Sequence, residues 1–290
     1  MPANDLLARF RRHDLGGSQR RPSRLAWLLV PIALLALWSF WIEPSRLVER
    51  HPALTIDGLP PVRLALLSDV HAGSAFVDRD RLREVVTRLN AAQPDVIALL
   101  GDYVTEGPLA TPIPPEETAA ILSGLRAPGG VYAVLGNHDN WHDGDRVARA
   151  FTSVGLRVLD AQKAEVTVRG RPLTILGIPD ESTRRPLLRP TWALLPPAGP
   201  VIGLTHSPDV FPESPPGVTL MVAGHTHGGQ VRLPLIGSPM APTSFGDRYV
   251  LGHVTERGHH LYVTTGLGTS LIPVRLGVPP EIVVLHINGA

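Results

Sequence analysis

Histidine, aspartate and asparagine residues follow apolar stretches at five places in this sequence. These places are Ser68-Asp69-Val70-His71, Gly101-Asp102-Tyr103, Gly136-Asn137-His138-Asp139, His206-Ser207-Pro208 and Gly224-His225-Thr226-His227-Gly228-Gly229-Gln230. Imidazole, carboxylate and carboxamide groups are ligands for divalent metal ions. Because the chain has no cysteine, any such ion would be held by nitrogen and oxygen atoms. The pattern therefore predicts a metal site.

The pair His225 and His227 is the most informative of these signals. Residues two apart in an extended strand lie on the same side of it, and flanking glycines let the backbone approach an ion or a phosphate closely. Each of the other clusters alone also fits a structural role, such as a turn cap for Asp69 or Asp102, or a satisfied polar group for His206. All five at strand ends indicate one shared site, because ligands of α/β sheets collect beyond the carboxyl ends of the strands.

The elements that must position these residues follow from the hydrophobic pattern. From Val62 onward short apolar runs alternate with amphipathic segments, which is typical of an α/β domain. Strands are predicted at 62–67, 96–100 and 131–135, and helices at 79–92, 116–125 and from a cap at Asp143 to about Val154. Further strands are predicted at 158–168, 173–178, 201–205, 218–223, 260–265 and 281–287, with few helices between them. The two regions predict two packed sheets in one domain.

The composition favours a packed globule over a disordered chain, since 43% of the 290 residues are hydrophobic and 18% are charged. The formal net charge is +1, but arginines are concentrated at the N-terminus. These arginines are Arg9, Arg11, Arg12, Arg20, Arg21 and Arg24. The remainder of the chain is slightly acidic, so we expect no nucleic-acid-binding face.

The uncharged run Leu25–Ile42 is at the lower end of the length that spans a bilayer, and tryptophans lie near both of its ends. Because arginines precede this run and Glu43 follows it, the positive-inside rule predicts a cytoplasmic N-terminus and an extracytoplasmic remainder. We therefore expect a single-pass anchor in the cytoplasmic membrane. A cleaved signal peptide is disfavoured, because Glu43-Pro44-Ser45-Arg46 offers no small-residue cleavage site. The pairs Arg11-Arg12 and Arg20-Arg21 are similar to a twin-arginine export signal, but neither has the expected hydrophobic context close behind it. A buried core helix is the remaining alternative.

In their order and spacing, the five clusters resemble the signature of the calcineurin-like metallophosphoesterases over about residues 60–287. That signature reads Asp-x-His, Gly-Asp, Gly-Asn-His-Asp/Glu, a single His and Gly-His-x-His. The N-terminal anchor, the Gly228-Gly229-Gln230 extension and the runs 266–270 and 273–275 are similar to the membrane-anchored bacterial branch of YkuE- and YaeI-type phosphodiesterases. The resemblance implies a four-layer α/β/β/α sandwich of two mixed sheets, preceded by one transmembrane helix.

The charge and hydrophobic patterns, together with the resemblance, indicate how the chain is divided. Residues 1–24 would be a basic cytoplasmic segment, 25–42 the transmembrane anchor, 43–60 a linker and 61–290 the metallophosphoesterase domain.

Roles for the site residues come from the same resemblance. Asp69, His71 and His227 would hold one divalent ion. Asn137, His206 and His225 would hold a second, and Asp102 would bridge the two. A two-metal site clamps a phosphoryl group and activates a water for in-line attack. The donor set suits Mn, Fe or Zn ions, and the sequence does not choose among them.

Three further residues are candidates for the chemistry or for substrate binding. His138 would be a catalytic histidine that stabilises the transferring phosphoryl group or protonates the leaving oxygen, and Asp139 would orient it. Arg275 would bind a substrate phosphate, with a structural role as the alternative.

The expected function is hydrolysis of phosphoric esters by a phosphodiesterase or phosphatase with a dinuclear metal centre. One alternative is a pyrophosphohydrolase of a lipid-linked nucleotide such as a UDP-glycolipid, and the partners would then be a lipid-linked phosphoester and the membrane itself. A second alternative is a non-catalytic, membrane-tethered binding module, and a missing ligand would be its mark. No ligand of the signature is missing.

Overall fold

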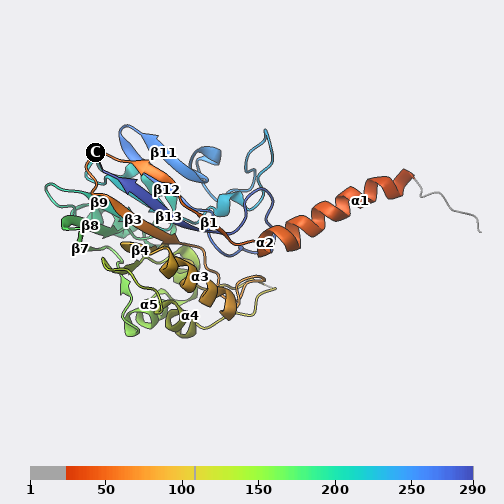
Figure 1. Cartoon of the computed structure of the whole chain (residues 1–290), viewed down its shortest axis with the longest axis horizontal. Helices are drawn as coiled ribbons and strands as arrows, with labels where there is room; N and C mark the ends of the chain where they lie inside the picture. Colours follow the sequence, from red (N-terminus) through yellow and green to blue (C-terminus); the bar gives the residue numbers. More distant parts are fainter. Residues whose placement is uncertain (1–23, 108, 290) are drawn as a thin grey trace, which may run out of the picture. The chain divides into compact units, whose positions relative to one another are not determined.

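Two mixed β-sheets organise the structure, a computed structural model that describes residues 24–107 and 109–289 (Figure 1). The first sheet contains β1 (Val48–Arg50), β2 (Ala53–Thr55), β3 (Val62–Leu67), β4 (Val96–Leu99), β5 (Val131–Ala133), β6 (Arg157–Val158) and β13 (Glu281–Asn288). The second contains β7 (Gln162–Val168), β8 (Arg171–Gly177), β9 (Val201–Leu204), β10 (Leu220–Ala223), β11 (Gly252–Glu256) and β12 (His259–Val263). The expectation of two mixed sheets is confirmed.

The strand order brings the predicted clusters to matching edges. In the first sheet β3, β4 and β5 are parallel neighbours, and β13 runs antiparallel to β3. In the second sheet β8, β9 and β10 are parallel neighbours, while β7 and β11 pair antiparallel at the two edges. The parallel strands of each sheet therefore end at one edge, where the clusters follow them.

Three apolar layers hold the sheets and helices together. Alternate residues of β3 point to opposite faces, so Leu64 and Leu66 pack between the sheets, whereas Ala65 and Leu67 pack against helices. The helices on that outer face are α3 (Arg79–Ala91), α4 (Pro115–Leu122) and α5 (Asn137–Ser153). The far face of the second sheet is covered by α7 (Leu188–Trp192) and by the short 3-10 helices around Phe211 and Tyr249. Both sheets are thus covered on both faces.

Helix α5 begins six residues earlier than the predicted cap at Asp143. The helix is kinked there, since Asp143 has φ −173° and ψ 84°. Its side chain accepts the N–H of Arg146 at 2.9 Å, so Asp143 does cap the second part of the helix. The earlier start places Asn137 and His138 in the first turn of α5.

Residues 43–60, expected to be a linker, contribute two strands to the first sheet. β1 and β2 pair in parallel with opposite ends of β13, and Glu43 and Pro44 are buried. The sequence signal was weak because each strand has only three residues. This segment is therefore part of the first sheet and not a linker outside it.

The N-terminal helical segment consists of α1 (Arg24–Leu37), a π-helical turn (Trp38–Ile42) and α2 (Glu43–Ser45). Within residues 24–107 and 109–289, no helix combines the length and the hydropathy needed to cross a membrane. The structure therefore does not confirm the expected transmembrane helix.

Candidate metal centre

Five loops meet where the parallel strands of the two sheets end. Asp69 and His71 follow β3, Asp102 follows β4, and Asn137 begins α5 just after β5. His206 follows β9 in the second sheet. The pair His225 and His227 follows β10.

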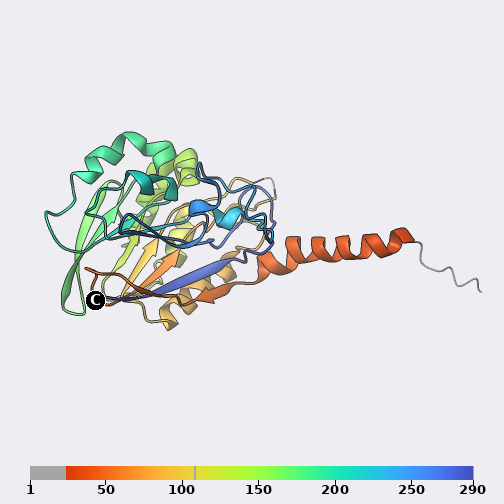
Figure 2. The same ribbon diagram turned by 90° about the horizontal axis from the view of Figure 1, so that it is seen from above.

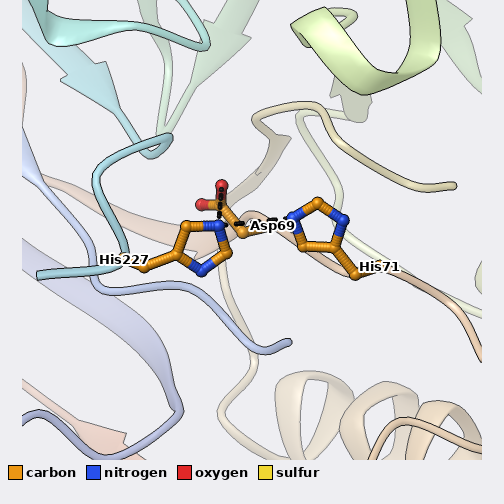
Figure 3. A group of neighbouring side chains, drawn as sticks. All are labelled: Asp69, His71 and His227. Carbon is orange, nitrogen blue, oxygen red and sulfur yellow. Dashed lines mark hydrogen bonds and ion pairs between the residues drawn. The ribbon is translucent and has the colours of Figure 1, made fainter. Parts of the chain in front are cut away.

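Asp69, His71 and His227 form a first group of metal-binding atoms (Figure 3). One ligand atom from each lies within 4.8 Å of the other two. His227 Nε2 is 3.4 Å from Asp69 Oδ1 and 3.3 Å from His71 Nε2. All three side chains are buried.

Asp102, His206 and His225 form a second group with the same compactness. His206 Nε2 lies 3.1 Å from Asp102 Oδ2 and 3.1 Å from His225 Nδ1. Asn137 Oδ1 is also 3.1 Å from His206 Nε2, so the carboxamide joins this group. The seven predicted ligands therefore lie in two adjacent groups, and a third compact set, made of His71, Asp102 and His138, overlaps both the first group and Asp102.

Asp102 lies between the two groups. The same Oδ2 atom is 3.1 Å from His206 Nε2 in the second group and 3.7 Å from His71 Nε2 in the first. Its other oxygen, Oδ1, accepts the backbone N–H of His138 at 2.9 Å. One carboxylate oxygen therefore faces a ligand nitrogen of each group, while the second oxygen is held by the backbone.

The hydrogen bonds of two histidines show that these groups fit a cation. His71 Nδ1 is 3.0 Å from the carbonyl of Val104, and His206 Nδ1 is 2.7 Å from the carbonyl of Leu100. A carbonyl only accepts, so each Nδ1 carries a proton, and in the neutral form that binds a metal each Nε2 presents a lone pair. These lone pairs face carboxylate and carboxamide oxygens, which are also acceptors. A bound cation satisfies such a set of converging acceptors.

The pKa values of His227 and His206 reflect their burial among the other ligand side chains. Burial lowers the pKa of His227 to about 3, despite the opposing charge of Asp69. This ring is therefore neutral and can offer a nitrogen lone pair to a metal ion. Burial also opposes the charged form of His206, but the charge and hydrogen bond of Asp102 outweigh it and raise the pKa to about 10. In the metal-free site, a proton on His206 thus supplies the positive charge that the carboxylate requires.

Five of the seven ligand-bearing residues have a left-handed backbone. The φ angles are 51° at Asp69, 41° at His71, 54° at Asp102, 69° at His225 and 51° at His227. Residues other than glycine rarely adopt this conformation, and it is concentrated at functional sites where surrounding contacts enforce it. The loops are therefore bent to aim these side chains inward.

Asp139 is one of the contacts that enforce these bends. Its carboxylate accepts the backbone N–H groups of Asp102 (2.8 Å), Tyr103 (2.8 Å), Val104 (3.2 Å) and Gly136 (2.9 Å). Burial, reinforced by the charge of Asp102, raises the pKa of Asp139 to about 7. The expected role was to orient the His138 ring. The structure instead places the carboxylate on the loop that carries Asp102, because four backbone donors converge there.

His138 lies on the partly open side of the site. Its ring is 4.9 Å from the ring of His71 and 5.0 Å from that of Trp141. Its Nε2 is 3.5 Å from Ser270 Oγ, and its Nδ1 is buried without a hydrogen-bond partner. The imidazole is therefore beside the ligand groups and has a nitrogen available for a proton.

Arg275 is fully buried and does not face the open side of the site. Its guanidinium donates to backbone carbonyls of residues in the loops beneath the ligands, which are His227, Thr265, Gly266, Gly268 and Val278. The expected contact with a substrate phosphate does not fit this position, because the donors are directed to carbonyls. The structural alternative fits, and Arg275 joins the loop of His227 to residues 265–278.

Two residues near the site were not singled out from the sequence. Asp180 follows β8 and is buried with Oδ1 unpartnered. Its signal was the same as that of Asp102, an acidic residue just after an apolar strand. Ser270 approaches His138 from a segment distant in sequence, and only the tertiary structure reveals this contact.

Comparison with known proteins agrees with the site geometry. Residues 62–229 match the family model described as calcineurin-like phosphoesterase. The chain is 31% identical over 260 residues to phosphodiesterase YaeI of Escherichia coli, covering 85% of this chain and 88% of that protein. It is 30% identical over 250 residues to the uncharacterized metallophosphoesterase YkuE of Bacillus subtilis, covering 82% of each chain. The chain therefore belongs to the calcineurin-like phosphoesterase family and is a metal-dependent phosphoester hydrolase.

Proposed function

We propose that this chain hydrolyses phosphodiesters with a dinuclear metal centre. The observation that carries the proposal is the shared Asp102 Oδ2, which faces a ligand nitrogen of each group. Asp69, His71 and His227 would hold one divalent ion, and Asn137, His206 and His225 would hold the other. The resemblance to a relative named a phosphodiesterase supports a diester substrate.

The residues of the chain contribute orientation and proton transfer. Divalent ions bound in the two groups would polarise a phosphoryl oxygen and lower the pKa of water. Asp102 holds the two groups together and anchors the first turn of α5 through the N–H of His138. The His138 ring, on the partly open side, is placed to give a proton to the leaving oxygen. Ser270 Oγ, at 3.5 Å, helps to orient that ring.

The test of the dinuclear proposal is metal stoichiometry together with activity. We expect the wild-type chain to bind two equivalents of Mn²⁺ or Zn²⁺ and to hydrolyse bis(p-nitrophenyl) phosphate. Asp102→Ala should abolish hydrolysis, and His225→Ala should lower the stoichiometry to one while retaining the first group. Full activity of Asp102→Ala at saturating metal would refute the bridging role. Activity at a single bound equivalent would refute the dinuclear mechanism.

We also propose that the N-terminal segment attaches the protein to the cytoplasmic membrane, with the catalytic domain outside. The uncharged run Leu25–Ile42 and the arginines before it support this proposal. A topology reporter fused after Ala290 tests it, because only an extracytoplasmic C-terminus activates a periplasmic phosphatase reporter. A cytoplasmic signal would instead favour a substrate on the inner face, such as a UDP-linked glycolipid pyrophosphate.

A further inference from the structure

Large apolar side chains are exposed mainly in four segments of the compact unit that begins at Leu37. The segments are the π-helical turn Trp38–Ile42 and the loops 105–111, 231–241 and 268–274. Their exposed members are Trp38, Phe40, Trp41, Leu109, Leu235, Ile236, Met240, Leu271 and Ile272. Among the described residues after Ile42, only two other large apolar side chains are exposed outside these segments, those of Trp141 and Leu251. We call these four segments the apolar rim.

Contacts between the segments show that the rim is continuous. The backbone N–H of Arg275 donates to the carbonyl of Ser39 at 2.9 Å, which joins loop 268–274 to the π-helical turn. Leu109 and Leu271 line the same small hollow. The N–H of Arg232 donates to the carbonyl of Leu276 at 2.8 Å, which joins loop 231–241. Figures 1 and 2 both show these loops at the end of the domain that carries α2.

The chemistry of the rim favours a lipid surface as its occupant. A contiguous exposed apolar patch marks an interaction site, and tryptophan is enriched where proteins meet the membrane interface. The chain continues from the rim directly into α1, where Leu29, Val30 and Ile32 are also exposed. No charged residue lies between Leu25 and Ile42. The exposed Arg46 lies with its guanidinium 5.6 Å from the centre of the Trp38 ring, and it adds a positive charge suited to anionic headgroups.

The rim also borders the metal centre. Ser270, next to Leu271, approaches His138 Nε2 to 3.5 Å, and its N–H donates to Gln230 Oε1 at 2.7 Å. Gln230 in turn donates from Nε2 to the carbonyl of Ile272 at 3.4 Å. Loop 268–274 and Gln230, the residue directly before loop 231–241, therefore meet beside the imidazole of His138.

We propose that the apolar rim docks on a lipid surface and presents the metal centre to phosphoester headgroups of membrane amphiphiles. The substrate part rests on the proposed function of the site, and the docking part does not. Attachment by the rim holds the domain close to the bilayer, so a headgroup reaches the site without leaving the membrane.

The absence of cysteine from the chain allows a direct test of docking. Single substitutions Ile236→Cys and Leu271→Cys place a polarity-sensitive fluorophore on the rim, and Leu251→Cys places it on an exposed leucine outside the rim. The full chain is reconstituted in vesicles of phosphatidylcholine and phosphatidylglycerol, with or without brominated acyl chains. We expect blue-shifted, quenched emission at 236 and 271 but not at 251. Equal quenching at all three positions, or quenching at none, would overturn the docking proposal. A blue shift that is unaffected by brominated lipid would assign the rim to self-association instead.

The substrate part is tested with two diesters that share one reacting group. Methyl p-nitrophenyl phosphate is soluble, whereas hexadecyl p-nitrophenyl phosphate inserts into vesicles. The variant Leu235→Asn/Ile236→Ser should hydrolyse the vesicle substrate on the order of tenfold more slowly and leave the rate on the soluble one unchanged. Leu251→Ser is the matched control and should affect neither rate. Equal loss on both diesters would overturn the substrate assignment. If the wild-type chain hydrolyses neither diester, the proposed function fails, while the quenching experiment still decides docking.

Discussion

Replacing Gly224 by alanine tests how closely the two sheets approach at the metal centre. A Cβ at this position would lie 1.8 Å from Ser68 Oγ and 2.5 Å from Asp69 Oδ2. Close packing does not tolerate such contacts, and relief requires a displacement of about 1 Å. The loop has little freedom to move, because the N–H of Gly224 donates to the carbonyl of His206 at 2.9 Å. The displacement therefore moves a predicted metal ligand.

Two magnitudes follow from this geometry. Overpacking of this kind lowers the free energy of unfolding by about 1–3 kcal/mol. Displacing Asp69 by about 1 Å lowers kcat/KM for an aryl phosphodiester on the order of 100-fold. The second variant Ser68→Gly removes the Oγ and Cβ atoms that meet the new methyl group, but it leaves the contact with Asp69 Oδ2. We expect Gly224→Ala/Ser68→Gly to regain stability relative to the single variant without regaining activity.

The assay combines denaturant unfolding of the metal-free chain in detergent, metal content and kcat/KM at saturating Mn²⁺. Gly217→Ala is the control, because a Cβ there would lie 3.3 Å from the flexible side chain of Leu195. It should change stability and activity little. If Gly224→Ala keeps activity within about threefold of wild type and unfolds at the same denaturant concentration, the close approach is not what positions Asp69.

Further predictions concern residues around the ligands. His138→Gln should lower kcat by about 10²–10⁴-fold with metal content unchanged, because it removes a proton donor and no ligand; loss of bound metal would contradict this role. Asp139→Asn should lower the free energy of unfolding by about 2–6 kcal/mol, because either orientation of the amide turns its NH₂ toward two backbone N–H donors. A change below about 0.5 kcal/mol in denaturant titration would contradict the stabilising role of these four hydrogen bonds. Arg275→Met should lower thermal stability by leaving buried carbonyls unpaired, while the KM of the folded fraction stays constant; a raised KM with unchanged stability would restore the substrate-binding role. Chelation should lower Tm, and excess Mn²⁺ at about 100 times its Kd should restore about 2.7 kcal/mol of the free energy of unfolding for each ion bound. A Tm independent of metal would contradict the metal site.

The sequence predicted the strands of the sheets and the types of metal-binding side chain well. Both can be recognised from residues that are close together in the chain. Apolar runs such as Val62–Leu67 are short and bounded by polar residues, so the first strand was located at its observed bounds. The ligand types and their positions after the strands were equally readable. β1 and β2 were missed, because strands of three residues leave no periodic pattern.

The tertiary structure decided how the polar groups are used. Asp139 and Arg275 carry ionisable groups, and the sequence suggested a catalytic role for Asp139 and either a substrate-binding or a structural role for Arg275. In the structure both are buried and hydrogen-bonded to backbone partners, four N–H groups for Asp139 and, through the two terminal nitrogens, five carbonyls for Arg275. Which backbone groups converge on a side chain depends on loops distant in sequence, and local patterns do not contain this information.

The sequence by itself therefore determined which atoms can bind metal and which strand carries each of them. The resemblance already named Asp102 as the bridge, but only the tertiary structure decided that its Oδ2 atom faces both groups and that the ligand loops adopt left-handed bends. The physical reason is that composition and periodicity follow from neighbours along the chain. A shared oxygen and a strained φ angle exist only when two sheets and their loops constrain each other in space.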